Sequence, residues 1–158
     1  MRSCVVVSVM ALFTGCSDGN NQGPGWATII GTIQQQTPQP TTAFYMAHPI
    51  LDIDVLVMPE AGEACATEAS DVGLTTVIGF PCGAATATSY PVADPDMACG
   101  EAPYVAILVE GFDGELDEVV ATAGTVTITS SAPSIVGTFT ATIDGVPVTG
   151  TFDAIDCR

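Results

Sequence analysis

The last part of the chain carries the pattern that most restricts its fold. Two runs with alternating apolar and polar residues, 135–143 and 146–154, flank the dipeptide Asp144-Gly145. Such a dipeptide between alternating runs is typical of a two-residue hairpin with a type I′ turn. Side chains alternate with period two, so one face is apolar and the other carries threonines and Asp153. The predicted apolar pairs are Ile143 with Val146, Ala141 with Val148, Phe139 with Gly150, Gly137 with Phe152 and Ile135 with Ala154.

Two further features of this hairpin follow from the same register. Each phenylalanine is expected to lie over the glycine opposite, so that the ring covers bare backbone. Pro147 has no N–H to donate, which predicts that the last strand begins at a sheet edge. Residues 125–129 also alternate, with Val126 and Ile128 inward, and should pair with 135–143. The sequence therefore predicts a C-terminal β-meander.

The rest of the chain consists of short apolar runs rich in β-branched residues. Gly, Pro, Asp or Ser separates them. This spacing predicts an all-β fold, an antiparallel β-sandwich or partly open barrel. The spacing of Leu116, Val119 and Val120 favours one short helix over residues 115–121. The length suits a single domain, assigned to residues 26–158. The runs outside the meander are 27–33, 43–46, 51–58, 74–80, 86–92 and 104–110.

The first 15 residues have the layout of a signal peptide. Arg2 is followed by an apolar run over residues 5–13 and by the small residues Thr14 and Gly15. A membrane-spanning helix needs roughly 20 apolar residues, and this run is about half as long. We therefore expect a cleaved signal rather than a permanent membrane span.

The segment Phe13-Thr14-Gly15-Cys16 resembles the lipobox of bacterial lipoproteins, whose usual form is Leu-Ala/Ser-Gly/Ala-Cys. The resemblance implies transfer of diacylglycerol to the sulfur of Cys16, cleavage after Gly15, and a membrane anchor of palmitate-type fatty acids. Residues 16–25 would then form a flexible tether. By the sorting rule of the enterobacterial members of that family, Ser17 after the cysteine, rather than Asp, implies the outer membrane of a Gram-negative cell envelope. The alternative is an ordinary secretory signal with a chance cysteine.

Four cysteines remain after Cys16: Cys65, Cys82, Cys99 and Cys157. An even number in an exported chain predicts two disulfides. Zinc is disfavoured, since there is no C-x-x-C pair and His48 is the one histidine. Three connectivities are open. We favour Cys82–Cys99, which closes a Pro-rich loop, with Cys65–Cys157 fastening the C-terminus.

The tail Phe152-Asp153-Ala154-x-x-Cys157 is also similar to the ends of uncharacterised lipoproteins from myxobacteria and their relatives. The similarity implies a shared sheet and a shared terminal disulfide. It implies no activity.

Charge limits the partners. All 18 acidic residues follow Cys16, and Arg158 is the one base after it, so the chain from Cys16 onward has a net charge of −17. Such a surface repels polyanions, which excludes nucleic acid as a partner. Anionic lipid headgroups would be repelled as well. Attachment to a membrane must therefore come from the covalent lipid on Cys16.

One acidic cluster is a candidate Ca²⁺ site. Asp113, Glu115 and Asp117 alternate in a predicted loop, and carboxylate oxygens are the ligands that Ca²⁺ prefers. The spacing lacks the glycine and the glutamate of an EF-hand, and a solvated loop explains the cluster equally. Asp52 and Asp54 are expected on the solvated face of a strand.

No catalytic constellation is recognisable, and the chain is predicted not to be an enzyme. His48 has neither a catalytic cysteine nor a G-x-S-x-G serine to act upon. A sugar-stacking surface and core packing both explain the scattered aromatic residues Trp26, Tyr45, Tyr90 and Tyr104.

The predicted function is a lipid-anchored, non-catalytic cell-envelope protein, structural or in contact with other envelope proteins, for example by strand addition at residues 146–148. A ligand- or Ca²⁺-binding surface module and a secreted hydrolase are the alternatives.

Overall fold

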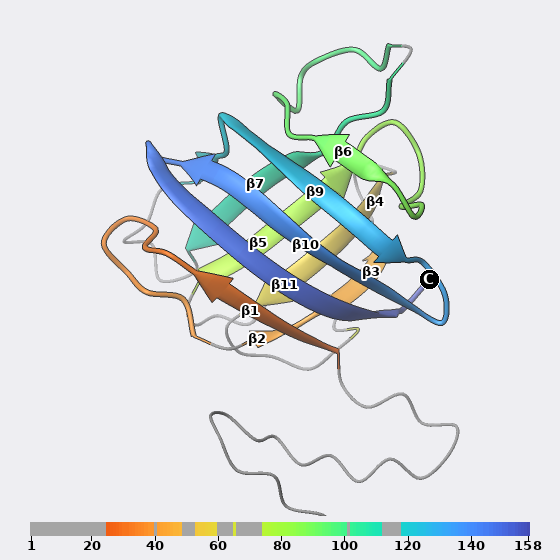
Figure 1. Ribbon diagram of the computed structural model, residues 1–158, viewed down its shortest axis with the longest axis horizontal. Helices are drawn as coiled ribbons and strands as arrows, with labels where there is room; N and C mark the ends of the chain where they lie inside the picture. The colour runs from red at the N-terminus through yellow and green to blue at the C-terminus, as the bar shows by residue number, and fades with distance from the viewer. Residues whose placement is uncertain are drawn as a thin grey trace, which may run out of the picture.

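The computed structural model describes residues 25–39, 41–48, 53–59, 65, 74–100, 102–111 and 118–158. These residues form an all-β fold, with 11 strands in one strongly curled sheet and no helix among them (Figure 1). Within this part of the chain no helix is therefore available to cross a membrane. The strands are β1 (Trp26–Ile30), β2 (Thr41–Thr42), β3 (Phe44–Ala47), β4 (Asp54–Pro59), β5 (Leu74–Phe80), β6 (Ser89–Pro91), β7 (Ala106–Gly111), β8 (Val119–Val120), β9 (Ala123–Ser130), β10 (Ser134–Ile143) and β11 (Val146–Asp156).

The sheet folds over itself at β11. The strand order is β6-β9-β10-β11-β3-β4-β5-β7-β8, and β1 pairs with both β11 and β2. Residues 149–153 of β11 pair with β1, whereas Ile155 and Asp156 pair with β3 in parallel. Every other ladder is antiparallel. In Figure 1 the layer of β1, β11, β10 and β9 crosses in front of β3, β4, β5 and β7. The fold is thus a partly open barrel with two packed layers, as predicted.

One isolated bridge and one crossing of the chain join the layers again at the other end of the sheet. Val92, just after β6, forms an isolated bridge with Val105, just before β7. Between β8 and β9 the chain passes from one layer to the other. There the Ala121 N–H donates to the Ile107 oxygen at 2.8 Å, and the Thr122 N–H donates to the Thr142 oxygen at 2.9 Å. The two ends of the sheet are therefore held together without a full ladder.

The predicted C-terminal meander is confirmed in its register. Every expected pair between β10 and β11 is present, from Ile143 opposite Val146 to Ile135 opposite Ala154. Asp144 and Gly145 have φ values of 50° and 74°, as a type I′ turn requires. β9 pairs with β10 and buries Val126 and Ile128.

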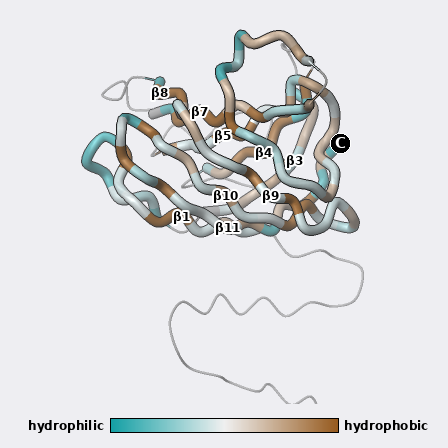
Figure 2. Tube along the Cα trace, turned by 45° about the horizontal axis from the view of Figure 1, so that its top comes forward, coloured by the Kyte–Doolittle hydropathy of each residue, from teal (hydrophilic) through white to brown (hydrophobic). Residues whose placement is uncertain are grey.

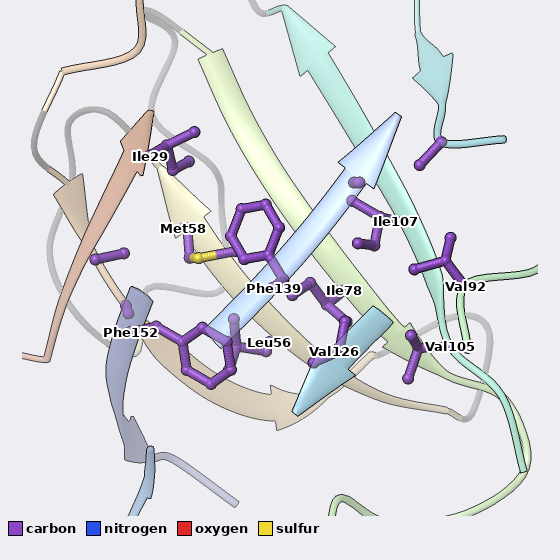
Figure 3. Packing of buried hydrophobic residues seen from close by; sticks show 14 of the residues in the cluster. Ile29, Leu56, Met58, Ile78, Val92, Val105, Ile107, Val126, Phe139 and Phe152 are labelled. Carbon is purple, nitrogen blue, oxygen red and sulfur yellow. The ribbon is translucent and has the colours of Figure 1, made fainter. Parts of the chain in front are cut away.

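The phenylalanine–glycine pairs are also present. A Cβ built on Gly150 would lie 2.2 Å from Phe139 Cε1, and one on Gly137 would lie 2.7 Å from Phe152 Cζ. Both rings are buried between the layers, and Figure 3 shows them directed from β10 and β11 toward β4, which carries Leu56 and Met58. At Gly137 and Gly150, the ring from the opposite strand thus fills the core space that a side chain would otherwise occupy.

The helix expected over residues 115–121 is wrong where the structure describes it. Val119 and Val120 form β8 and pair with Val109 and Leu108 of β7. These β-branched side chains fit the pleated sheet, and tertiary pairing outweighs the helical spacing. Residues 115–117 lie outside the described part of the chain.

Both favoured disulfides are present. Cys65 is bonded to Cys157 and Cys82 to Cys99, each with a Cα–Cα distance of 5.5 Å. The first fastens the end of β11, where the Cys157 N–H also donates to the Tyr45 oxygen at 2.8 Å. The second closes the segment that contains β6.

Candidate functional site

A polar cluster lies where the chain ends, beside β3 and β4. Arg158 contacts two carboxylates: its Nη2 is 2.6 Å from Asp156 Oδ2, and its Nη1 is 3.4 Å from Asp54 Oδ2. The guanidinium carbon lies 4.6 Å from the centre of the Tyr45 ring, in cation–π geometry. The one base after Cys16 is therefore engaged on three sides.

Tyr45 is the buried centre of this cluster. Its hydroxyl donates to Asp54 Oδ2 at 2.9 Å and accepts from the Ala85 N–H at 2.8 Å. Burial raises the pKa of the Tyr45 phenol well above its ordinary value, and the Asp54 carboxylate adds to this effect. Tyr45 is therefore a neutral hydrogen-bond donor that connects β3 to β4 and to the segment after β5.

The ion pair at the surface of the cluster is mutually stabilised. The Arg158 guanidinium lowers the pKa of the Asp156 carboxyl through its hydrogen bond, and Asp156 raises the pKa of Arg158 in return. Both side chains are about one-third exposed, so the pair adds only modestly to stability. The Arg158 guanidinium donates to Asp54 and Asp156 within the cluster. Together with the Cys65–Cys157 disulfide, these contacts fasten the C-terminus to the sheet.

The second candidate is the outward surface of the layer that contains the meander, which we call the threonine face. Its central row crosses five strands: Thr28 lies opposite Thr151, then Thr138, Thr127 and Ser89 follow. The Ser89 and Thr127 hydroxyls are hydrogen-bonded at 2.9 Å. The neighbouring row consists of Ile30, Thr149, Thr140, Thr125 and Pro91.

The threonine face is almost free of charge. Among the outward positions of β1, β9, β10 and β11, the one ionisable residue is Asp153. On a chain with a formal net charge of −16, an anionic partner meets little repulsion at this face. It offers hydroxyl groups and methyl groups, so it suits contacts made by hydrogen bonding and packing rather than by charge.

β1 forms an apolar border of this face. Its outward residues are Trp26, Thr28 and Ile30, and Ala27 and Ile29 point into the core. Trp26 is 51% exposed and Ile30 is 68% exposed. Figure 2 shows the strongly hydrophobic positions along β1. The border is the part of the face where burial against a partner would remove most apolar surface from water.

The edge proposed for strand addition is partly covered by the chain itself. Residues 146–148 lie beyond the stretch of β11 that pairs with β1. Gly31, which follows β1, packs against this edge, and a Cβ built on it would lie 3.1 Å from the Pro147 oxygen. Pro147 also has no N–H to offer an added strand.

Several candidate residues lie outside the described part of the chain: Cys16, Asp52, and the Ca²⁺ candidates Asp113, Glu115 and Asp117. Among the residues that are described, no group of three His, Cys, Asp or Glu side chains is placed to hold a metal ion. His48 is half-buried after β3, and its backbone N–H donates to the Ile53 oxygen at 2.7 Å.

The four aromatic residues singled out from the sequence do not form a common surface. Tyr45, Tyr90 and Tyr104 are buried, and only Trp26 is exposed. The core-packing alternative therefore holds for the tyrosines.

Sequence reasoning missed the cluster around Tyr45 and the exposed border on β1. The cluster joins residues 104 positions apart, which no local pattern can indicate. The border had a partial signal, since Trp26, Thr28 and Ile30 share one face of the strand, but Ala27 and Ile29 make the other face apolar as well, so the pattern leaves open which face is outward. Comparison of the chain with protein-family models, curated proteins and solved structures found no match.

Proposed function

We propose that the chain is a lipid-anchored, non-catalytic protein of a bacterial cell envelope, held through Cys16 in the outer membrane of a Gram-negative cell. The observation that carries the proposal is the pair of disulfides, Cys65–Cys157 and Cys82–Cys99. Structural disulfides persist in oxidising compartments outside the cytoplasm. The lipobox-like segment that ends at Cys16 also requires export, so the disulfides and this segment support the same compartment.

Charge supports a covalent anchor over electrostatic attachment. With 18 acidic residues and Arg158 after Cys16, the domain is repelled by anionic headgroups. One acyl chain binds a membrane only marginally, whereas two chains anchor stably. A diacylglyceryl group on Cys16 supplies two.

The role proposed for the anchored domain is contact with neighbouring envelope proteins. The threonine face supports this role better than the edge at residues 146–148, because Pro147 lacks an N–H and Gly31 packs against that edge. Arg158 is engaged by Asp54 and Asp156, so the face, and not the charged cluster, is the surface open to a partner.

Lipidation is tested by growing the host with radioactive palmitate. The wild-type chain should be labelled and Cys16→Ser should not, because the sulfur of Cys16 is the acylated atom. Cys4→Ser is the matched control, since Cys4 lies within the signal and its loss should leave labelling unchanged. An unlabelled wild-type band, or a purified product that still begins with Met1, contradicts the anchor.

Contact through the threonine face is tested by crosslinking on intact cells. Thr138→Glu places a charge in the middle of the face and should reduce the yield of crosslinked envelope proteins. Ala98→Glu adds the same charge in the exposed loop after β6 and is the matched control. Equal crosslinking yields for both variants and the wild type would refute contact through this face.

A further inference from the structure

Exposed apolar side chains gather on one strand. Among the described residues, three large hydrophobic side chains are exposed: Trp26, Ile30 and Met97. Two of them lie on the same outward face of β1, separated by Thr28. Trp26 and Ile30 are four residue steps apart, about 13 Å along a strand, so both can touch one flat surface at the same time.

The surroundings of this strip carry little charge. Trp26 lies opposite Thr42 of β2 and Asp153 of β11, and Ile30 lies opposite Thr149. Covering the strip therefore desolvates hydroxyl groups and one carboxylate. A surface that presents neutral polar groups beside apolar ones would match it, and a strongly anionic surface would be repelled by Asp153.

The length of chain between Cys16 and Trp26 limits how far the exposed face of β1 can lie from Cys16. Gly25 is buried, and a Cβ built on it would lie 1.9 Å from the Ala43 oxygen, so this residue is packed into the domain. From residue 16 to residue 25 there are nine peptide steps. Such a chain spans at most about 30 Å when extended and about 17 Å when relaxed. Trp26 is the first residue after this tether.

We propose that the outward face of β1 docks on the bilayer to which Cys16 is anchored, with Trp26 and Ile30 among neutral lipid headgroups. The proposal rests on the proposed lipid anchor. Tryptophan is enriched at membrane–water interfaces, because its ring is apolar and its N–H can still meet a polar partner. The tether makes the contact intramolecular, with an effective concentration in the millimolar range, so two exposed side chains suffice to orient the domain.

Docking through β1 is compatible with the proposed contacts to envelope proteins. β1 is the border of the threonine face, and β11 separates it from the parts of the two rows that lie on β10 and β9. A domain that stands on β1 would leave those parts for contact with neighbours in the same membrane.

Trp26 is itself the probe, because it is the one tryptophan of the chain. The lipidated protein is reconstituted in phosphatidylcholine vesicles, and its emission is compared with that of the Cys16→Ser protein. We expect a blue shift, and quenching when the lipids carry bromine on the acyl chain close to the headgroup. Ile30→Ser should weaken the quenching, and Met97→Ser, which changes an exposed apolar residue elsewhere, should not. Replacing part of the phosphatidylcholine with phosphatidylglycerol should weaken it as well.

The outcomes separate the docking from the anchor. A lipidated protein that floats with the vesicles while its Trp26 emission stays unshifted and unquenched overturns the docking and leaves the anchor intact. A protein that carries no lipid on Cys16 overturns both. If Trp26 emission is already blue-shifted without vesicles and light scattering shows a dimer, a second copy covers β1, and the docking on lipid is wrong.

Discussion

Gly150 and Phe139 offer the sharpest test of the packing between the layers. The Phe139 ring occupies the space that a side chain at position 150 would need, with Cε1 at 2.2 Å and Cζ at 2.6 Å from an ideal Cβ. Phe139 is 2% exposed and packs within the core cluster, so its ring is enclosed by buried neighbours that would have to shift with it. Gly150→Ala and Phe139→Ala should therefore be strongly coupled.

The expected free energies of unfolding follow from the two kinds of change. Phe139→Ala removes a buried ring and should cost about 3–5 kcal/mol. Gly150→Ala forces a methyl group against the ring and should cost about 1–3 kcal/mol. In the double variant the methyl group enters the space that the ring has left. Its cost should fall short of the sum of the single variants by about 1–2 kcal/mol. The rescue is limited, because the Thr28 oxygen stays 2.9 Å from the new Cβ.

The second phenylalanine–glycine pair is the matched control. A Cβ on Gly137 would lie 2.4 Å from the Thr127 oxygen, a backbone atom that remains when Phe152 is replaced. Phe152→Ala should cost about 3–5 kcal/mol as well, but it should rescue Gly137→Ala much less.

The assay is urea unfolding of the Cys16→Ser chain with both disulfides intact, followed by circular dichroism. Additivity within about 0.5 kcal/mol at the first pair would refute the reasoning. So would a cost below about 1 kcal/mol for Phe139→Ala, because a buried ring cannot be removed so cheaply.

Three further predictions concern the disulfides and the C-terminal cluster. Loop-closure entropy predicts that opening Cys82–Cys99, with a separation of 17, costs about 3 kcal/mol of unfolding free energy, and that opening Cys65–Cys157, with a separation of 92, costs about 4.5 kcal/mol. Urea unfolding of the serine variants checks this order. Four alkylatable thiols in the native protein would contradict both bonds. Tyr45→Phe removes the acceptor of a buried N–H and should cost about 1–3 kcal/mol at neutral pH. Since the folded pKa of Tyr45 is raised, the stabilisation by its neutral hydroxyl is complete below a pH of about 10 and declines above that pH. A cost of Tyr45→Phe that stays constant to higher pH would argue against the raised pKa. The folded pKa of Asp156 is lowered from 3.8, so its contribution is present above that pH and is lost on acidification. Arg158→Gln should therefore cost about 0.5–1 kcal/mol at pH 7 and less after acid protonation of Asp156, when the contact with the Tyr45 ring remains; urea unfolding at the two pH values measures the difference, and an equal cost at both would refute the ion pair.

The meander could be predicted from the sequence because its information is local. Asp144-Gly145 sets the turn, the turn sets the register, and the alternation from 135 to 154 decides which side chains are buried. The same local information placed each phenylalanine over its glycine. Residues 119–120 show the opposite case: two valines fit either a helix or a strand, and pairing with β7, not their own spacing, decided between them.

The features that could not be predicted depend on contacts between distant residues. The parallel pairing of Ile155 and Asp156 with β3 curls the sheet, and it requires the end of the chain to lie beside residues 44–45. The cluster of Tyr45, Asp54 and Arg158 forms only after that pairing. The alternation in residues 26–30 was visible, but which side of the strand would face the core depended on its pairing with β11.

The placement of charge connects the fold with the proposed anchor. A domain with a net charge of −17 would be held away from an anionic bilayer if its carboxylates were spread evenly. Two of them, Asp94 and Asp96, lie in the loop after β6, which Figure 1 shows at the far side of the molecule from the beginning of β1. Beside the strand where the tether enters, the one carboxylate on the threonine face is Asp153. In the proposed orientation, electrostatic repulsion is low because Asp94 and Asp96 stand away from the headgroups, while Trp26 and Ile30 are buried among them. The two effects respond differently to salt, because screening shortens the Debye length from about 10 Å at 0.1 M to about 3 Å at 1 M and leaves apolar burial in place. Docking that persists at high salt therefore points to the β1 side chains as its cause.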